Sequence, residues 1–140
     1  MSNTLWWSFL LCWMAILMIP LSAPAQEVSD LNDYVEQLND QCPIKYKDDW
    51  GINSFTMVGD RYALVDLQLP SNLAMFLPSL SSNADNVKQL WIKQLSLYGE
   101  RWTDFVDKMV DAGRSVIVNL RPKGSNETYL ITLIPSDFKK

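Results

Sequence analysis

The chain has 140 residues, of which 16 are acidic, 12 are basic and none is histidine, so its formal net charge is -4. Without histidine it lacks the commonest general base and metal ligand, which excludes catalytic pairs and zinc sites built on that residue. The slightly acidic balance gives no electrostatic reason to bind nucleic acid or anionic lipid.

The N-terminal segment has the features of a targeting sequence. The first 25 residues carry no charged side chain, and an apolar run from Leu5 to Leu21 is followed by Ala23 and Ala25. Such a run ahead of small residues is typical of a secretory signal peptide. We predict cleavage after Ala25, which leaves one exported domain over residues 26–140 in the periplasm, cell envelope or medium. If the run is retained, it would anchor the protein in a membrane.

A first amphipathic helix is predicted from residue 28 to residue 42. One face of it carries apolar residues at steps of three and four, namely Val28, Leu31, Val35, Leu38 and Cys42. Pro43 ends the helix at or before Cys42, because the residue ahead of a proline is disfavoured in the helical conformation.

Cys42 is the single cysteine of the predicted exported domain, since the other, Cys12, lies in the leader. Its place on the apolar stripe favours a free thiol buried as a small hydrophobic group. A disulfide to another chain is an alternative in an oxidising compartment. A catalytic thiol would have no histidine to activate it.

A β-hairpin is predicted next. The segments 52–58 and 61–69 flank Gly59-Asp60, a two-residue connection typical of antiparallel strands. Alternation in the second segment places one set of side chains toward the core, namely Ala63, Val65, Leu67 and Leu69.

A long helical pattern extends from residue 84 to residue 112, with Gly99 as a point where it can divide and Gly113 as its C-terminal cap. Two further strands follow over residues 114–121 and 127–134. The last is apolar on both faces, which favours a central position or cover by helices. The order predicts an α+β fold of the α-β-β-α-β-β type, with two helices on one face of a four-stranded antiparallel sheet.

Two surfaces are candidate partner-binding sites. The first, called the apolar connection, lies between the second strand and the long helix and comprises Leu73, Met75, Phe76, Leu77 and Leu80. The second, called the acidic stripe, lies on one helix face and comprises Glu100, Asp104, Asp107 and Asp111. The simpler interpretations are a cap on the core and a solvated helix face. The acidic spacing matches no calcium loop, so no metal or cofactor is expected.

These features favour a non-enzymatic envelope or secreted protein that acts by binding another protein. One version is an immunity or inhibitor protein whose acidic stripe neutralises a basic exported toxin or hydrolase. Another is an accessory protein anchored by its N-terminal run. Catalysis by carboxylates would fall to Asp48, Asp49 and Asp66, but no pattern brings them into one pocket.

The segment "LNDQCPI" at the end of the first helix resembles one in small exported bacterial proteins of uncharacterised function. The matching residues are Leu38, Asn39, Gln41, Cys42 and Pro43. In that group an "LN-x-QCP" segment also follows a signal peptide. The resemblance implies an envelope or secreted location and brings no known activity.

Overall fold

The computed structural model describes residues 30–139. The predicted signal peptide and its cleavage site lie outside these residues. The chain divides into two compact units, residues 1–31 and 32–140. Asp30 and Leu31 are the described residues of the first unit, and they begin a helix that continues to Asp40.

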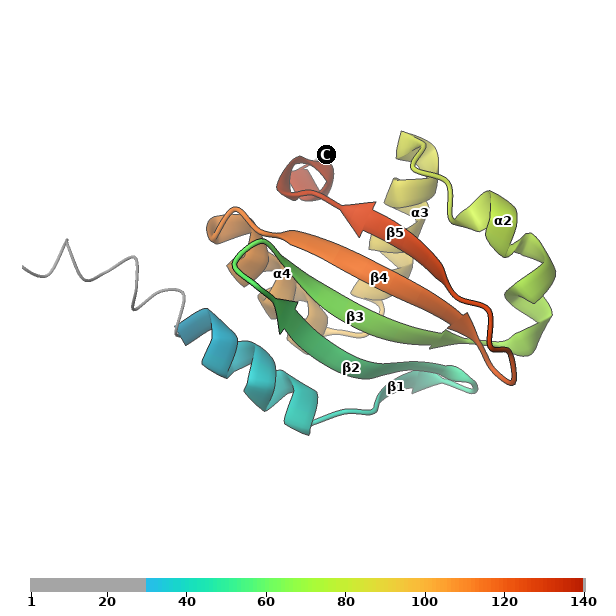
Figure 1. The fold of residues 1–140 in the computed structure, drawn as a ribbon, viewed down its shortest axis with the longest axis horizontal. Coiled ribbons are helices and arrows are strands. Elements are labelled where there is room, and N and C mark those ends of the chain that lie inside the picture. Colours follow the sequence, from blue (N-terminus) through green and yellow to red (C-terminus); the bar gives the residue numbers. More distant parts are fainter. Residues whose placement is uncertain (1–29, 140) are drawn as a thin grey trace, which may run out of the picture. The chain divides into compact units, whose positions relative to one another are not determined.

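The second unit contains a five-stranded mixed sheet (Figure 1). Its strands lie side by side in chain order, as β1 (Ile44–Lys47), β2 (Trp50–Val58), β3 (Tyr62–Leu69), β4 (Ser115–Pro122) and β5 (Tyr129–Leu133). Neighbouring strands are antiparallel at three of the four junctions, and β3 and β4 are parallel.

The α+β class is confirmed, but the predicted four-stranded antiparallel sheet is wrong in two respects. β1 was missed because it has four residues, of which Ile44 alone is buried. β3 and β4 are parallel because the chain between Leu69 and Ser115 crosses one face of the sheet through helices, and a long crossover of this kind joins parallel strands.

The predicted hairpin is confirmed, with β2 and β3 paired antiparallel. Val58 and Tyr62 are its last paired residues, so the turn contains Gly59, Asp60 and Arg61, one residue more than predicted. The inward set of β3 is fully buried as expected, comprising Ala63, Val65, Leu67 and Leu69.

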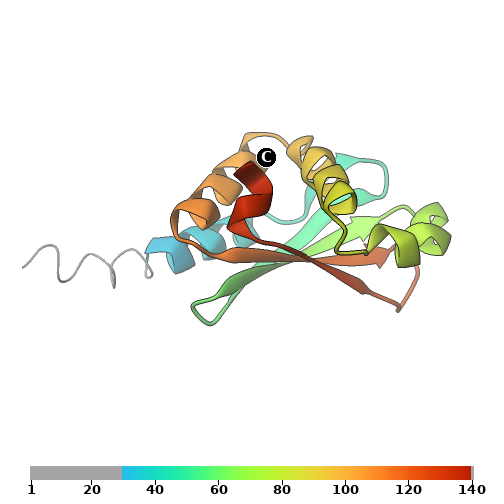
Figure 2. The same cartoon turned by 90° about the horizontal axis from the view of Figure 1, so that it is seen from above.

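The crossover begins with two short helices, η1 (Ser71–Phe76) and α2 (Leu77–Leu80). The long helical pattern that follows is divided at Gly99 into α3 (Asp85–Ser96) and α4 (Glu100–Asp111). Gly99 has a φ of 90°, a conformation that residues with a Cβ atom rarely adopt. The chain ends in a 3-10 helix, η2 (Pro135–Lys139), which lies on the same side of the sheet as α3 and α4 (Figure 2).

The core lies between the sheet and these helices. α3 contributes Trp91 and Leu95, and α4 contributes an apolar face of four buried residues. These are Trp102, Phe105, Val106 and Met109. The rings of Phe55 on β2 and Phe105 meet edge to face with centroids 5.0 Å apart, a favourable arrangement for aromatic pairs.

Within the second unit, the first helix lies beside β2 and α4. Asn39 accepts a hydrogen bond through Oδ1 from the Phe55 backbone N–H at 3.0 Å. The Lys108 ammonium of α4 lies 5.0 Å from the centroid of the Tyr34 ring. The helix ends at Asp40, ahead of Pro43, as the sequence predicts.

β5 differs from its predicted position, because it forms an edge of the sheet and its outward face is open. Leu130 on that face is 58% exposed. Across residues 30–139, no helix is long and apolar enough to cross a membrane.

Candidate functional site

A groove of about 290 Å³ runs between α3 and α4 on the helical side of the sheet. Trp102, Val106 and Val110 reach it from α4, and Ile92 reaches it from α3. Phe138 of η2 completes the apolar lining, while polar Ser96, Thr103, Asp107 and Lys139 form its rim. This helix groove combines an apolar floor with a polar border, as protein-binding clefts commonly do.

The η2 wall of the helix groove is held in place by Asp137. This buried carboxylate accepts hydrogen bonds from the Ile134 backbone N–H at 2.9 Å and from the Lys88 ammonium of α3 at 3.1 Å. The Gln89 side chain donates to the Asp137 carbonyl at 2.9 Å. These contacts fix η2, and therefore Phe138, against α3.

The acidic stripe lies exposed along α4, and Asp107 also lines the helix groove. Within the described part of the chain, none of its four carboxylates forms an ion pair. Burial raises the pKa of the Tyr34 hydroxyl on the neighbouring helix, and the charge of Asp104 adds to the rise. The stripe is therefore a negatively charged, solvent-exposed surface beside an apolar groove.

The apolar connection is split between core and surface. Leu77 is fully buried, so it caps the core, whereas Met75 and Phe76 are 78% and 54% exposed. Leu73 and Leu80 are half-buried, and the Leu80 carbonyl accepts a hydrogen bond from the Trp91 indole N–H at 2.6 Å. Met75 and Phe76 are the members that a partner can reach.

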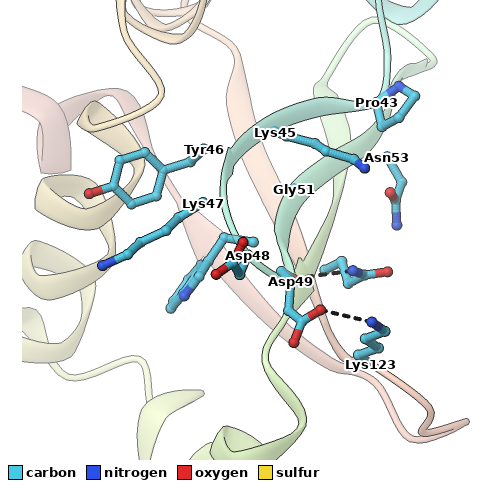
Figure 3. A pocket seen from close by; sticks show the side chains of 11 residues that line it. Pro43, Lys45, Tyr46, Lys47, Asp48, Asp49, Gly51, Asn53 and Lys123 are labelled. Atoms are coloured by element: carbon cyan, nitrogen blue, oxygen red, sulfur yellow. Dashed lines mark hydrogen bonds and ion pairs between the residues drawn. The ribbon is translucent and has the colours of Figure 1, made fainter.

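A second, polar pocket lies at the turn between β1 and β2 (Figure 3). Asp49 adopts a φ of 62° there and pairs with Lys123 at 2.8 Å, and the Gln68 amide donates to the Asp49 carbonyl at 3.2 Å. The Asp49 carboxylate raises the pKa of Lys123 through this hydrogen bond. Lys45 extends toward Asn53, whereas Lys47 points to the opposite side, because the strand register shifts between the two lysines.

This polar pocket offers hydrogen bonds but no evident catalytic pair. Asp48 and Asp49 line it, whereas Asp66 is not part of its lining and pairs with Arg121 at 3.3 Å. The three carboxylates named as catalytic candidates are thus not brought together. Among residues 30–139, no group of three or more histidine, cysteine or acidic side chains is arranged to hold a metal ion.

Cys42 is a free, half-buried cysteine just beyond the first helix. Its thiol donates to the Leu38 carbonyl at 3.6 Å, and burial raises its pKa despite the opposing charge of Arg101. A raised pKa lowers the fraction of reactive thiolate at neutral pH.

Comparison with known proteins gives relationships of fold. No protein-family model matches the chain, and no curated protein matches it by sequence. A candidate secreted protein from Pseudomonas aeruginosa superposes with a TM-score of 0.56 at 12% identity, over 81% of this chain and 93% of that one. EpsS, the pilotin of the Vibrio vulnificus type 2 secretion system, superposes with a TM-score of 0.55 at 10% identity, over 83% and 94%. This chain shares their fold.

The helix groove was not predicted from the sequence. The helical pattern placed Trp102 on the core face of the long helix but gave no reason to expect a gap beside it. Phe138 lies in a segment that looks like a short polar tail. The signal that could have located it is Asp137, which can fold back to cap a short helix at the end of β5.

Proposed function

We propose that this chain is an exported, non-enzymatic protein of the cell envelope that acts by binding another protein through the helix groove. The observation that carries the proposal is the adjacency of an apolar floor and an unpaired acidic stripe on α4. An apolar depression with charged residues at its rim selects partners by both shape and charge.

The surface chemistry specifies the kind of partner segment. The floor formed by Trp102, Val106 and Phe138 suits apolar side chains, while Asp107 and the rest of the stripe favour lysine or arginine beside them. An amphipathic segment with a basic flank meets both requirements. Charge complementarity of this kind speeds association and makes it sensitive to salt.

The fold similarities support an envelope location and an accessory role. One of the similar structures is a secretion-system pilotin and the other is a candidate secreted protein. An accessory role in the assembly of an envelope complex is therefore the first version to test. An immunity or inhibitor role is distinguished from it by the partner, which would be an exported toxin or hydrolase.

The proposal can be tested by site-specific photocrosslinking in the native host. A photoreactive phenylalanine analogue at Val110, inside the helix groove, is compared with the same analogue at Leu90, an exposed position of α3 outside the groove lining. We expect one crosslinked partner at Val110, absent at Leu90, in a 1:1 complex that dissociates at about 0.5 M salt, where the Debye length falls to a few ångströms.

A matched pair of charge variants tests the role of the acidic stripe. The double substitution Asp104→Asn/Asp107→Asn removes two stripe charges, whereas Asp33→Asn/Asp40→Asn removes two exposed charges from the first helix. We expect the first pair to lower crosslinking at Val110 at least about fivefold and the second to leave it unchanged. Equal yields at Val110 and Leu90, or equal effects of the two pairs, would contradict the proposal.

A further inference from the structure

Gly51, near the start of β2, is the one glycine of this chain whose place the backbone alone does not explain. The other four glycines all have positive φ values, a region that residues with a Cβ atom rarely adopt. Gly51 does not, and a Cβ atom built on it would lie 3.6 Å from the Ile44 carbonyl oxygen, an ordinary van der Waals distance. The strand register is also regular there, since Gly51 pairs with Lys45 on β1 and with Gln68 on β3. Alanine would therefore fit at this position.

A glycine inside a strand is less favourable than alanine, because it loses more conformational freedom on folding. It often marks a place where a ligand or another backbone approaches closely. Among the described residues, the other atom near a Cβ built on Gly51 belongs to the Lys45 side chain, at 3.8 Å. No backbone comes close enough to require glycine, so the approach of a ligand is the remaining use of this position.

Gly51 is buried and forms part of the lining of the polar pocket (Figure 3). Residues paired across neighbouring strands point to the same face of a sheet, so the side chains of Lys45 and Gln68 stand on either side of the glycine. The pocket has a volume of about 680 Å³, within the range of small-molecule sites. The missing side chain therefore deepens a hollow of suitable size.

The charges around the polar pocket leave one ammonium group uncompensated. Its lining contains three lysines and two aspartates, a balance of one positive charge. Lys123 pairs with Asp49 at 2.8 Å, and beyond the lining Asp66 pairs with Arg121 at 3.3 Å. Lys45 has no ion-pair partner within the part of the chain that the structure describes. A ligand with a single negative charge would balance it.

Two amides complete the polar groups beside Lys45. The Gln68 amide nitrogen donates to the Asp49 carbonyl at 3.2 Å, which leaves the amide oxygen to accept from a ligand. Asn53 is exposed, and Lys45 extends toward it (Figure 3). Hydroxyl groups donate and accept as amides do, whereas a carboxylate is the match for an ammonium. The lining therefore suits a molecule that carries one carboxylate and several hydroxyl groups.

We propose that the polar pocket binds a sugar acid. Its carboxylate pairs with Lys45, its hydroxyl groups bond to Asn53 and Gln68, and one face of its ring lies against Gly51. A phosphate group carries between about 1.5 and 2 negative charges at neutral pH, more than one free ammonium balances. The proposal does not rest on the helix groove, whose lining shares no residue with this pocket.

The test is a titration of the isotope-labelled protein in its natively processed form, followed by amide NMR shifts at constant ionic strength. The probes are galacturonate, galactose, which lacks the carboxylate, and acetate, which lacks the hydroxyl groups. Titration to about 30 mM covers the millimolar affinity of a small ligand held by a few polar contacts. We expect galacturonate to shift the Gly51 and Asn53 signals and to bind at least about fivefold more tightly than either other probe.

Variants locate the site. Lys45→Gln should weaken galacturonate binding at least about fivefold, because the ammonium is lost. Gly51→Ala should weaken it at least about threefold, because the added methyl group fills the place of the ring. The melting temperature of Gly51→Ala should stay equal or rise, since alanine loses less conformational freedom on folding. Lys93→Gln, at an exposed lysine of α3 outside the pocket lining, is the matched charge control and should bind galacturonate like the wild type.

The absence of shifts at about 30 mM galacturonate would overturn the proposal. Equal binding of acetate would reveal a simple anion site, and equal binding of galactose would remove the role of Lys45, so either result would also overturn it. Equal losses in Lys45→Gln and Lys93→Gln would place the binding elsewhere. A lower melting temperature of Gly51→Ala would give the glycine a role in folding and contradict the observation on which the proposal is based.

Discussion

Tyr98 is a buried residue with an unsatisfied polar group. It lies in the turn between α3 and α4, and its ring packs against Tyr46 with centroids 5.6 Å apart. Its hydroxyl oxygen is buried and has no hydrogen-bond partner among the described residues. A buried polar atom without a partner costs about 1–3 kcal/mol. Tyr98 is therefore a place where a small change should stabilise the protein.

We predict that Tyr98→Phe leaves the free energy of unfolding unchanged or raises it by up to about 2 kcal/mol at neutral pH, because the variant removes the desolvation cost of the hydroxyl. Urea titration measures this value. Tyr129→Phe, at a half-buried tyrosine of the edge strand, is the control. A loss of more than about 1 kcal/mol in Tyr98→Phe alone would indicate that the hydroxyl has a partner.

The same variant has a distinctive effect at high pH. Burial raises the pKa of Tyr98 above its ordinary value, and Tyr46 adds to the rise. The unfolded chain therefore loses this proton at a lower pH than the folded chain, so the associated stability is present below about pH 10 and is lost as the pH rises further. Tyr98→Phe should flatten that decline. An unchanged slope would show that Tyr98 does not titrate in this way.

At the scale of elements, η2 depends on one ion pair. Asp137 accepts from Lys88 and from the backbone of Ile134, and both charged side chains are largely buried. Removing one partner of a buried pair is costly because the other charge remains without compensation. The C-terminal wall of the helix groove should therefore be sensitive to a single substitution.

We predict that Asp137→Ala lowers the free energy of unfolding by about 3 kcal/mol. The single variants Lys88→Met and Asp137→Asn should each lower the free energy of unfolding. In the double variant Lys88→Met/Asp137→Asn this loss should be at least about 1 kcal/mol smaller than the sum of the two single losses, because no charge is left unpaired. The exposed pair Asp66–Arg121 provides the control, and Arg121→Gln should cost less than about 1 kcal/mol. Additive single effects would show that Lys88 and Asp137 do not stabilise each other.

Some elements of the fold could be predicted from sequence patterns and others could not. Alternation identified the inward face of β3, and the spacing of large apolar residues identified α3 and α4, because burial on one face repeats with a fixed period. β1 and the parallel pairing of β3 with β4 were missed. A four-residue edge strand has too few positions to show a period, and strand direction depends on where the crossover brings the chain back.

The candidate sites show the same limit. The acidic stripe was predicted because its members follow one helical period. In the structure all four lie exposed on α4. The helix groove required three separate elements to meet, including Phe138 from the last turn of the chain. A depression between elements is a property of their packing, and one sequence contains little information about it.

At the scale of the whole molecule, the prediction to test is that an apolar signal peptide is removed from a domain that folds on its own. Within the described part of the chain, the buried residues of the second unit come from residues 35–137. A body of this length can bury a single core and fold cooperatively. We therefore expect the predicted signal peptide to be needed for export and not for stability.

We therefore predict that the protein recovered after export begins at Gln26 and unfolds in one cooperative thermal transition. Intact-mass measurement determines the first residue, and comparison of spectra with and without reductant shows whether Cys42 is joined to another chain. We expect identical masses, because the thiol is half-buried and its pKa is raised. A mass that includes the apolar run would instead support a membrane-anchored accessory protein. A reductant-sensitive dimer would establish Cys42 as an intermolecular crosslink, since it is the one cysteine that remains after cleavage.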